Sequence, residues 1–238
     1  MELSGYPVTA PPLRAPVWIA QFWTDLTFLH WPVRPEQVAD LFPPGTRPDL
    51  HDGLTYVALV PFVMRHTRLG ATVPLPYFGT FAETNVRLYS VDEQGRHGVL
   101  FRSLETARLA VVPLTRTVLG VPYTWARMSV THTGDRIEYR SVRRWPKRGL
   151  RSALTVTVGE QVEPSPLEVW LTARWGAHTR KAGRTWWVPN EHGPWPLHQA
   201  EIIDMADELV DVGALGERLR PLYSPGVHTR FGRPEILR

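Results

Sequence analysis

The chain has 238 residues, a hydrophobic fraction of 43% and a formal net charge of +4 at pH 7. These totals suit one β-rich domain with a real core, and no apolar run is long enough to span a membrane. The absence of cysteine excludes disulfides and thiolate chemistry, and the first residues lack the basic and apolar regions of a signal peptide. We therefore expect a cytoplasmic protein with a single domain over residues 1–238, in which residues 1–16 form an N-terminal arm.

The first half of the chain predicts strands joined by tight turns. Residues 35–41 suit a short helix with proline in its first turn. Asp52-Gly53 is a hairpin signal, the prolines of 72–79 indicate a loop, and the apolar run 109–119 suits a short helix. Alternation and β-branched or aromatic content predict strands over 17–31, 54–68, 81–91 and 99–108.

The second half continues the same pattern. A capping box at Ser165-Pro166-Leu167-Glu168 predicts a helix that runs to about residue 175. Residues 206–222 look irregular or weakly helical. Strands are expected over 128–132, 136–142, 152–162, 185–188, 197–205 and 226–232. Many short strands with two or three helices predict a β-rich α+β fold.

Five segments spread over nearly the whole chain carry a family pattern: 23–31, 52–62, 83–89, 98–104 and 192–197. In these segments the chain resembles a bacterial family of uncharacterised proteins, domain of unknown function 2071, within the acetoacetate-decarboxylase-like superfamily. The resemblance implies an antiparallel cone or barrel with a few flanking helices and a ligand site in its lumen.

The segment 120–126, Gly-Val-Pro-Tyr-Thr-Trp-Ala, is similar to the Gly-Phe-Pro-Lys-Lys-Leu-Ala segment of acetoacetate decarboxylase. In that enzyme the first lysine forms a Schiff base with the keto acid and the second lowers its pKa. Tyr123 and Thr124 occupy these positions here, and neither side chain can form an imine. The two lysines of the chain, Lys147 and Lys181, lie elsewhere. We therefore expect no true acetoacetate decarboxylase activity.

One face of the strand 81–89 carries Phe81, Glu83, Asn85, Arg87 and Tyr89, a mixture that suits either solvent or a polar pocket. The resemblance favours the pocket, because it aligns Glu83 with the active-site glutamate of acetoacetate decarboxylase. We predict Glu83 as a general acid or base, with a pKa raised by burial.

Tyr123 is the second predicted catalytic residue, as a hydrogen-bond donor to a carbonyl or oxyanion. A buried core tyrosine is the alternative interpretation. Because neighbours on a strand point to opposite faces, only one of Tyr123 and Thr124 should face the lumen. The predicted substrate-binding residues are Asn85, Arg87, Arg102, Arg116, Thr124, Trp125 and His192. Arg102 and Arg116 are also candidate partners of Glu83, since Arg87 lies about 13 Å away along the strand.

No metal or cofactor is expected. The glycine and prolines that follow His192 prevent the helical spacing of a zinc motif, so a histidine at the pocket rim is the better interpretation. The arginines and lysine of 140–151 could meet nucleic acid, but no nucleic-acid motif accompanies them, and a solvated face is favoured.

The sequence therefore predicts a protein that binds a small carbonyl-bearing organic acid in the barrel lumen. Its chemistry would be acid–base, lyase-type catalysis without a Schiff-base lysine. A non-catalytic small-molecule binding protein is the alternative. Neither nucleic acid nor membrane is an expected partner, and a homo-oligomer remains open.

Overall fold

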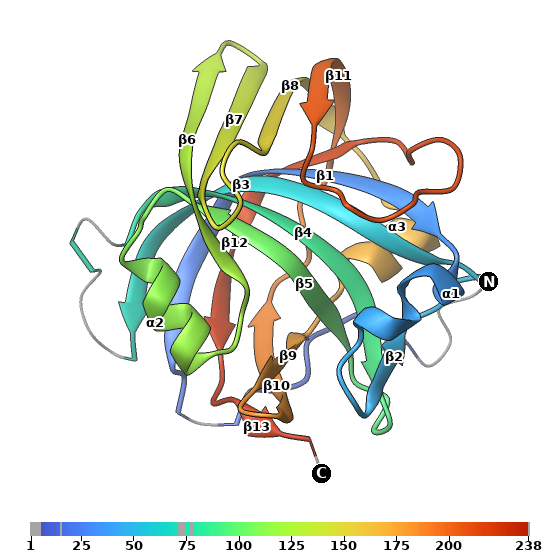
Figure 1. Cartoon of the computed structure of the whole chain (residues 1–238). Helices are drawn as coiled ribbons and strands as arrows, with labels where there is room; N and C mark the ends of the chain where they lie inside the picture. The colour runs from blue at the N-terminus through green and yellow to red at the C-terminus, as the bar shows by residue number, and fades with distance from the viewer. Residues whose placement is uncertain (1–5, 15, 71–74, 77–78, 238) are drawn as a thin grey trace.

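The structure is a computed structural model that describes residues 6–14, 16–70, 75–76 and 79–237 (Figure 1). Within these ranges thirteen strands form one sheet. They are β1 (Ile19–Val33), β2 (Thr46–Pro48), β3 (Thr55–Leu69), β4 (Phe81–Asp92), β5 (His97–Thr106), β6 (Tyr123–Thr133), β7 (Arg136–Trp145), β8 (Arg151–Gln161), β9 (Gly176–Lys181), β10 (Arg184–His192), β11 (His198–Asp207), β12 (Leu222–Phe231) and β13 (Glu235–Ile236). The predicted β-rich class is confirmed.

The helices are short and lie beside the sheet: α1 (Pro35–Val38), extended by a 3₁₀ turn over Ala39–Leu41, α2 (Val111–Val118) and α3 (Pro166–Thr172). The predicted capping box of α3 is present, with Glu168 N donating to Ser165 Oγ at 3.3 Å and Ser165 N donating to Glu168 Oε2 at 2.8 Å. Among the described residues, no helix combines the length and apolar character needed to cross a bilayer.

The sheet closes on itself twice. The path β5-β6-β7-β8-β11-β12-β1-β3-β4 returns to β5 through the β4–β5 pairing, which makes a nine-strand ring. A second path, β5-β9-β10-β12-β1-β3-β4, makes a seven-strand ring that shares β1, β3, β4, β5 and β12 with the first. Because side chains alternate across a strand, the shared strands send one face into each ring.

The nine-strand ring is filled by an aliphatic and aromatic core. Val86 and Leu88 of β4 are fully buried there with side chains from β3, β7 and β8: Val57, Leu59, Ile137, Tyr139, Leu154 and Val156. The opposite face of β4 looks into the seven-strand ring. One face of β4 therefore packs into an apolar core, and the other carries Glu83, Asn85 and Arg87.

Four segments differ from the sequence prediction. Strand β12 begins at Leu222, inside a region predicted to be irregular, and the short strands β2 and β13 were not predicted. Strand β9 was missed because its buried residues, Gly176 to Thr179, include polar side chains and show no alternation. The loop predicted over 72–79 lies largely outside the described residues.

Candidate functional site

The seven-strand ring contains a cavity of about 420 Å³, within the usual range for small-molecule sites. Its wall is mostly apolar, with aromatic side chains that include Trp23, Phe62, Phe81, Phe101 and Trp195. A few polar residues interrupt this wall: Gln21, Glu83, Asn85, Arg87, Tyr123, Thr172, Arg174, Asn190 and His192. A small number of polar groups in an apolar pocket is the usual arrangement for fixing a ligand's orientation.

Strand β4 supplies three of these polar groups at alternate positions. Glu83, Asn85 and Arg87 all line the cavity, and their exposed fractions are only 2%, 6% and 8%. The mixed face that could have been solvated is therefore buried and turned toward the cavity. The Oδ1 atom of Asn85 has no hydrogen-bond partner within the described part of the chain.

Glu83 and Tyr123 form a direct pair. The Tyr123 hydroxyl donates to Glu83 Oε2 at 3.0 Å, and both side chains are buried. Burial raises the pKa of Glu83 to about 8, and the Tyr123 hydrogen bond offsets only part of that effect. Burial and the neighbouring Glu83 together hold the pKa of Tyr123 well above its ordinary value. At neutral pH both groups therefore carry a proton for most of the time.

Arg87 is a buried cation that faces the cavity. Its Nη2 atom donates weakly to the Tyr89 hydroxyl and the Leu171 carbonyl, both at 3.4 Å, and its guanidinium lies 5.7 Å and 5.6 Å from the Phe28 and Tyr89 rings. No carboxylate of the described residues stands among these partners, and Nε has none. Ring contacts replace only part of the hydration that burial removes from a cation.

Arg174, the other arginine on the cavity wall, is neutralised by the protein itself. Its Nη1 atom forms an ion pair with Asp49, and its Nε donates to the Trp170 carbonyl at 2.9 Å. Its guanidinium also lies 3.9 Å from the centre of the Trp170 ring. Of these two arginines, only Arg174 has a carboxylate partner among the described residues.

His192 lies on the cavity wall between aromatic rings. Its ring centre is 4.8 Å from those of Trp175 and Trp195. Burial lowers the pKa of His192 to about 4, so the ring is neutral at pH 7. Its Nδ1 lies 2.7 Å from the Gly193 carbonyl, which requires the proton on Nδ1 and leaves Nε2 as an acceptor. Within the described residues, no three side chains of metal-binding type gather around it or elsewhere.

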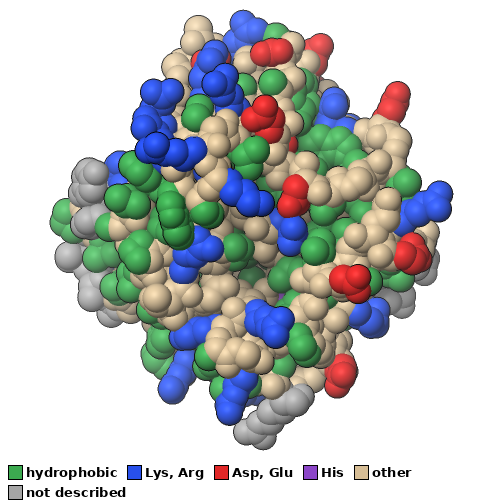
Figure 2. All heavy atoms as spheres, viewed as in Figure 1, with side chains coloured by type: hydrophobic (Ala, Val, Ile, Leu, Met, Phe, Trp, Pro, Cys, Tyr) green, Lys and Arg blue, Asp and Glu red, His purple; other side chains and the backbone are tan. Residues whose placement is uncertain are grey.

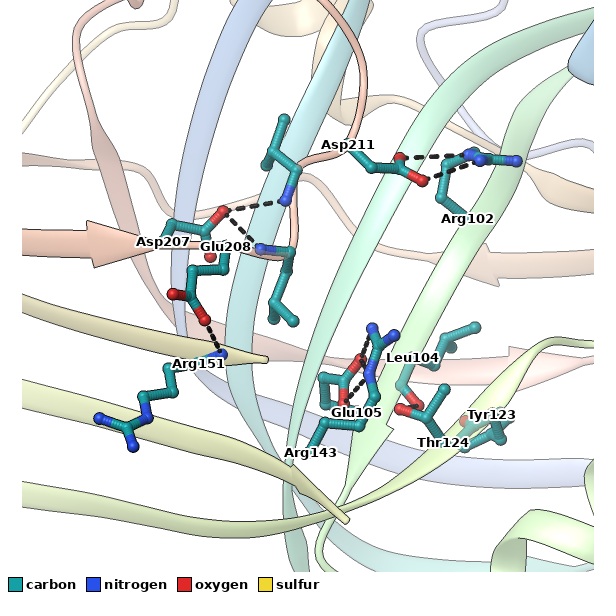
Figure 3. Close-up of polar contacts among 12 residues, drawn as sticks. Arg102, Leu104, Glu105, Tyr123, Thr124, Arg143, Arg151, Asp207, Glu208 and Asp211 are labelled. Atoms are coloured by element: carbon teal, nitrogen blue, oxygen red, sulfur yellow. Dashed lines mark hydrogen bonds and ion pairs between the residues drawn. The ribbon is translucent and has the colours of Figure 1, made fainter. Parts of the chain in front are cut away.

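Two predicted arginines, Arg102 (Figure 3) and Arg116, do not line the cavity. Arg102 donates to Asp211 at 2.9 Å near the surface. The β4–β5 register skips it between Phe101 and Ser103, and such a bulge redirects the extra residue's side chain. Arg116, on α2, donates to the Tyr123 backbone carbonyl at 3.1 Å. Neither arginine is a partner of Glu83, so both predictions were wrong.

Thr124 and Trp125 also lie outside the cavity wall. Thr124 follows Tyr123 on β6 and faces the opposite side, where its hydroxyl donates to the Leu104 carbonyl at 3.4 Å (Figure 3). Trp125 is partly buried, and the Arg144 guanidinium lies 5.9 Å from its ring. The expectation that only one of Tyr123 and Thr124 faces the lumen is confirmed, and Thr124 and Trp125, which were predicted to bind substrate, do not line the cavity.

Sequence reasoning missed several wall residues. Arg174 lies just before β9, a strand that was not predicted, and Asn190 lies in its partner β10. Neither residue belongs to a sequence motif that indicates a site. Trp195 belongs to a family segment, and its indole donates to the Thr172 carbonyl at 3.1 Å. Buried polar residues beside an undetected strand have no local sequence signal.

A second polar cluster has the residue types of a hydrolase triad but a different geometry. Ser90 Oγ lies 2.8 Å from His178 Nδ1, and Asp92 Oδ2 lies 3.2 Å from His178 Nε2. In a serine hydrolase the two ring nitrogens have the opposite partners. Ser90 and His178 are also completely buried and do not line the cavity. This cluster therefore satisfies the polar groups of β9.

The basic segment 140–151 divides between surface and interior. Arg143 Nε donates to both carboxylate oxygens of the fully buried Glu105, at 3.0 Å and 3.1 Å (Figure 3). Arg140 is exposed and pairs with Glu138. Figure 2 shows basic side chains gathered over the β6–β7 hairpin. Because Arg143 is used inside the protein, the segment does not present all its cations on one face; the absence of a nucleic-acid partner stays a prediction.

Comparison with known proteins agrees with this architecture. The uncharacterized protein YqjF of Bacillus subtilis is 30% identical over 188 residues, which cover 78% of this chain and 77% of the relative. Acetoacetate decarboxylase from Legionella pneumophila superposes with a TM-score of 0.67 at 12% identity, over 96% of this chain and 92% of that one. The enduracididine biosynthesis enzyme MppR, solved with pyruvate, gives a TM-score of 0.63 at 15% identity, over 95% and 92%.

The two solved structures are too distant in sequence to show more than the fold, and they confirm the acetoacetate-decarboxylase-like cone expected from the sequence. The sequence profile of the family DUF2071, described as an uncharacterized conserved protein, matches residues 20–228. That range contains every strand of the seven-strand ring except the first residue of β1 and the last three residues of β12. The chain therefore belongs to the DUF2071 family and has an acetoacetate-decarboxylase-like fold.

Proposed function

We propose that this protein binds a small organic acid that carries a carbonyl group, in the cavity of the seven-strand ring. Arg87 binds the carboxylate, and the Glu83–Tyr123 pair forms a hydrogen bond with the carbonyl. The observation that carries this proposal is the buried Arg87 guanidinium, which has no carboxylate partner among the described residues.

The energetic reason is the cost of a buried, unpaired charge. A charge taken from water loses several kcal/mol of solvation unless a counter-charge or hydrogen bonds replace it. Arg87 has two long hydrogen bonds and two aromatic contacts, whereas a carboxylate would form charge-assisted bonds. A neighbour of the same fold, MppR, was solved with pyruvate, a small oxo acid, which supports a ligand of this class.

The Glu83–Tyr123 pair gives the site acid–base chemistry. Near neutral pH the pair holds two protons, and one of them is enough for the hydrogen bond between the two groups. The second proton can be donated to a carbonyl oxygen. When Glu83 loses its proton, its carboxylate can instead remove a proton from the carbon beside the carbonyl, leaving the electron pair in an enolate.

Binding is tested by calorimetric titration of pyruvate into the wild-type protein, Arg87→Met and Arg140→Met. Arg140 is an exposed arginine outside the cavity, which makes it a matched control. We expect Arg87→Met to weaken binding by at least about tenfold, since a charge-assisted hydrogen bond contributes about 1.5–3 kcal/mol, and Arg140→Met to leave it unchanged. Equal affinities in all three proteins would contradict the proposed role of Arg87.

Catalysis is tested by proton NMR of deuterium uptake beside the ketone carbonyl of levulinate and longer methyl-ketone acids in heavy water. We expect the protein to accelerate this exchange, with a rate that changes as pH passes about 8, and Glu83→Gln to abolish the acceleration. The rate rises through that pH if Glu83 acts as a base and falls if it acts as an acid.

Binding without accelerated exchange would favour the second candidate, a non-catalytic binding protein. The largely aromatic and aliphatic cavity wall is the observation that supports this candidate. An exchange rate that Glu83→Gln leaves unchanged would contradict the role of Glu83 as the proton carrier.

A further inference from the structure

We infer that the ligand's carboxylate and carbonyl are separated by several carbon atoms, so that the site takes a medium-chain oxo acid and not a short 2-oxo or 3-oxo acid. This inference rests on the proposed function, because it assigns the carboxylate to Arg87 and the carbonyl to Glu83 and Tyr123. The observation behind it is the distance between these two positions in the cavity.

Both groups lie on β4, four residues apart. Their Cα atoms are about 13 Å apart along a regular strand, and side chains stand roughly perpendicular to a sheet. The Arg87 guanidinium donates to the Tyr89 hydroxyl and the Leu171 carbonyl, whereas the Glu83 carboxyl is bonded to Tyr123, so the two groups share no hydrogen-bond partner among the described residues. A C–C bond is about 1.5 Å long, and the carboxylate and carbonyl of pyruvate or acetoacetate therefore cannot reach both groups together.

The electrostatics of the cavity agree with this separation. Burial is the largest cause that lowers the pKa of His192, and the Arg87 charge contributes to the same effect. The shift of the Glu83 pKa arises from burial and Tyr123. The Arg87 charge thus affects the pKa of His192 and not that of Glu83. Glu83 and Tyr123 form a separate polar position in the cavity.

The wall between the two positions is suited to a hydrocarbon chain. On β3, Phe62 pairs with Glu83 and Val60 with Asn85, and on β5, Leu104 pairs with Asn85 and Phe101 with Arg87. All four apolar neighbours, Val60, Phe62, Phe101 and Leu104, line the cavity. Between the two positions, Asn85 is the polar residue of β4 that lines the cavity, and its Oδ1, which has no partner among the described residues, would accept a hydrogen bond from a hydroxyl on the ligand's chain.

The test is a calorimetric series of methyl-ketone acids in which only the number of methylenes between carboxylate and ketone increases, beginning with acetoacetate and levulinate. Each acid is compared with the saturated fatty acid of the same chain length. The proteins are the wild type, Arg87→Met, Glu83→Gln and Arg140→Met. Glu83→Gln keeps an acceptor for the Tyr123 hydroxyl but removes the acidic proton.

We expect affinity to rise by at least about tenfold from acetoacetate to a longer oxo acid, because one further buried hydrogen bond and apolar burial are gained. At that length the oxo acid should bind more tightly than its fatty-acid control, and Glu83→Gln should remove this advantage. Arg87→Met should weaken the binding of every acid in the series. Arg140→Met should leave all the affinities unchanged.

Two kinds of failure are distinguishable. If acetoacetate binds as tightly as the longer acids, or Glu83→Gln leaves the advantage over the fatty acid intact, the spacing is wrong while carboxylate binding at Arg87 stands. If no acid binds, or Arg87→Met changes none of the affinities, the proposed function fails and the spacing fails with it.

Discussion

At the scale of single residues, burial in the cavity wall has different effects on the two ionisable groups of β4, Glu83 and Arg87. Glu83 escapes the cost of burial by keeping its proton, since its pKa is raised to about 8. Arginine has no such escape, because its side chain stays charged in proteins. The same cavity wall therefore carries a neutral acid beside Tyr123 and a charged Arg87 near Leu171, and this Arg87 has no carboxylate partner among the described residues.

The raised pKa of Glu83 predicts a pH dependence of stability. The folded protein keeps the Glu83 proton between about pH 4.5 and 8, whereas the unfolded chain has lost it, so stability falls as pH rises through this window. Glu83→Gln has no proton to lose and should exceed the wild type at pH 8 by on the order of 3 kcal/mol, with little difference near pH 4.

Urea unfolding at a series of pH values measures this difference, with Glu93→Gln as an exposed control that should follow the wild type. Parallel stability curves for the wild type and Glu83→Gln would mean that Glu83 is ionised in the folded protein.

At the scale of elements, the second ring depends on a close approach between β5 and β9. The strands share a single register pair, Val99 with Ala177, and Gly98 lies beneath the Trp187 ring beside it. A Cβ on Gly98 would lie 2.5 Å from the Trp187 ring and 2.7 Å from the Gly176 carbonyl oxygen. Glycine is needed here because the backbone and the indole leave no room for a methyl group.

Gly98→Ala should therefore destabilise the protein by about 1–3 kcal/mol, as overpacking usually does. Gly193→Ala is the matched control, because no atom lies within 4 Å of its added Cβ. Thermal unfolding of the two variants compares these sites directly. A Gly98→Ala protein as stable as Gly193→Ala would show that β5 and β9 can separate at low cost.

The elements also show where sequence is informative. The two-residue period of 81–91 was enough to predict β4 and to group Glu83, Asn85 and Arg87 on one face. The side to which that face turns depends on how the sheet closes, and only the family resemblance indicated it. Arg102 was misplaced because a bulge in β5 changes the alternation, and a bulge has no sequence signal at that position.

At the scale of the whole molecule, two rings that share five strands differ in what fills them. The nine-strand ring has a filled apolar core, and the seven-strand ring has a cavity with a few polar groups. The strand pattern predicted the β-rich class, and the family resemblance predicted the cone. The contents of the cavity depend on pairs far apart in the sequence, such as Glu83 with Tyr123 and Arg174 with Asp49.

The molecule as a whole also limits the chemistry. Of the two lysines, Lys181 donates to the Val118 carbonyl at 2.8 Å and Lys147 is exposed, and neither lines the cavity. Borohydride reduction in the presence of acetoacetate should therefore give no covalent adduct at a cavity residue, as judged by intact and peptide mass spectrometry. An authentic acetoacetate decarboxylase is the positive control. A specific adduct at either lysine would contradict the conclusion that imine chemistry is absent.

The most direct test of the central claim is the thermal stability of Arg87→Met with and without a carboxylic acid. If Arg87 is a buried cation whose counter-charge is the ligand's carboxylate, removing its charge should stabilise the unliganded protein by about 1–3 kcal/mol. The Met side chain suits the surrounding Phe28 and Tyr89 rings. A saturating oxo acid should raise the melting temperature of the wild type but not that of Arg87→Met. An Arg87→Met protein that is less stable than the wild type, and is still stabilised by the acid, would contradict the account.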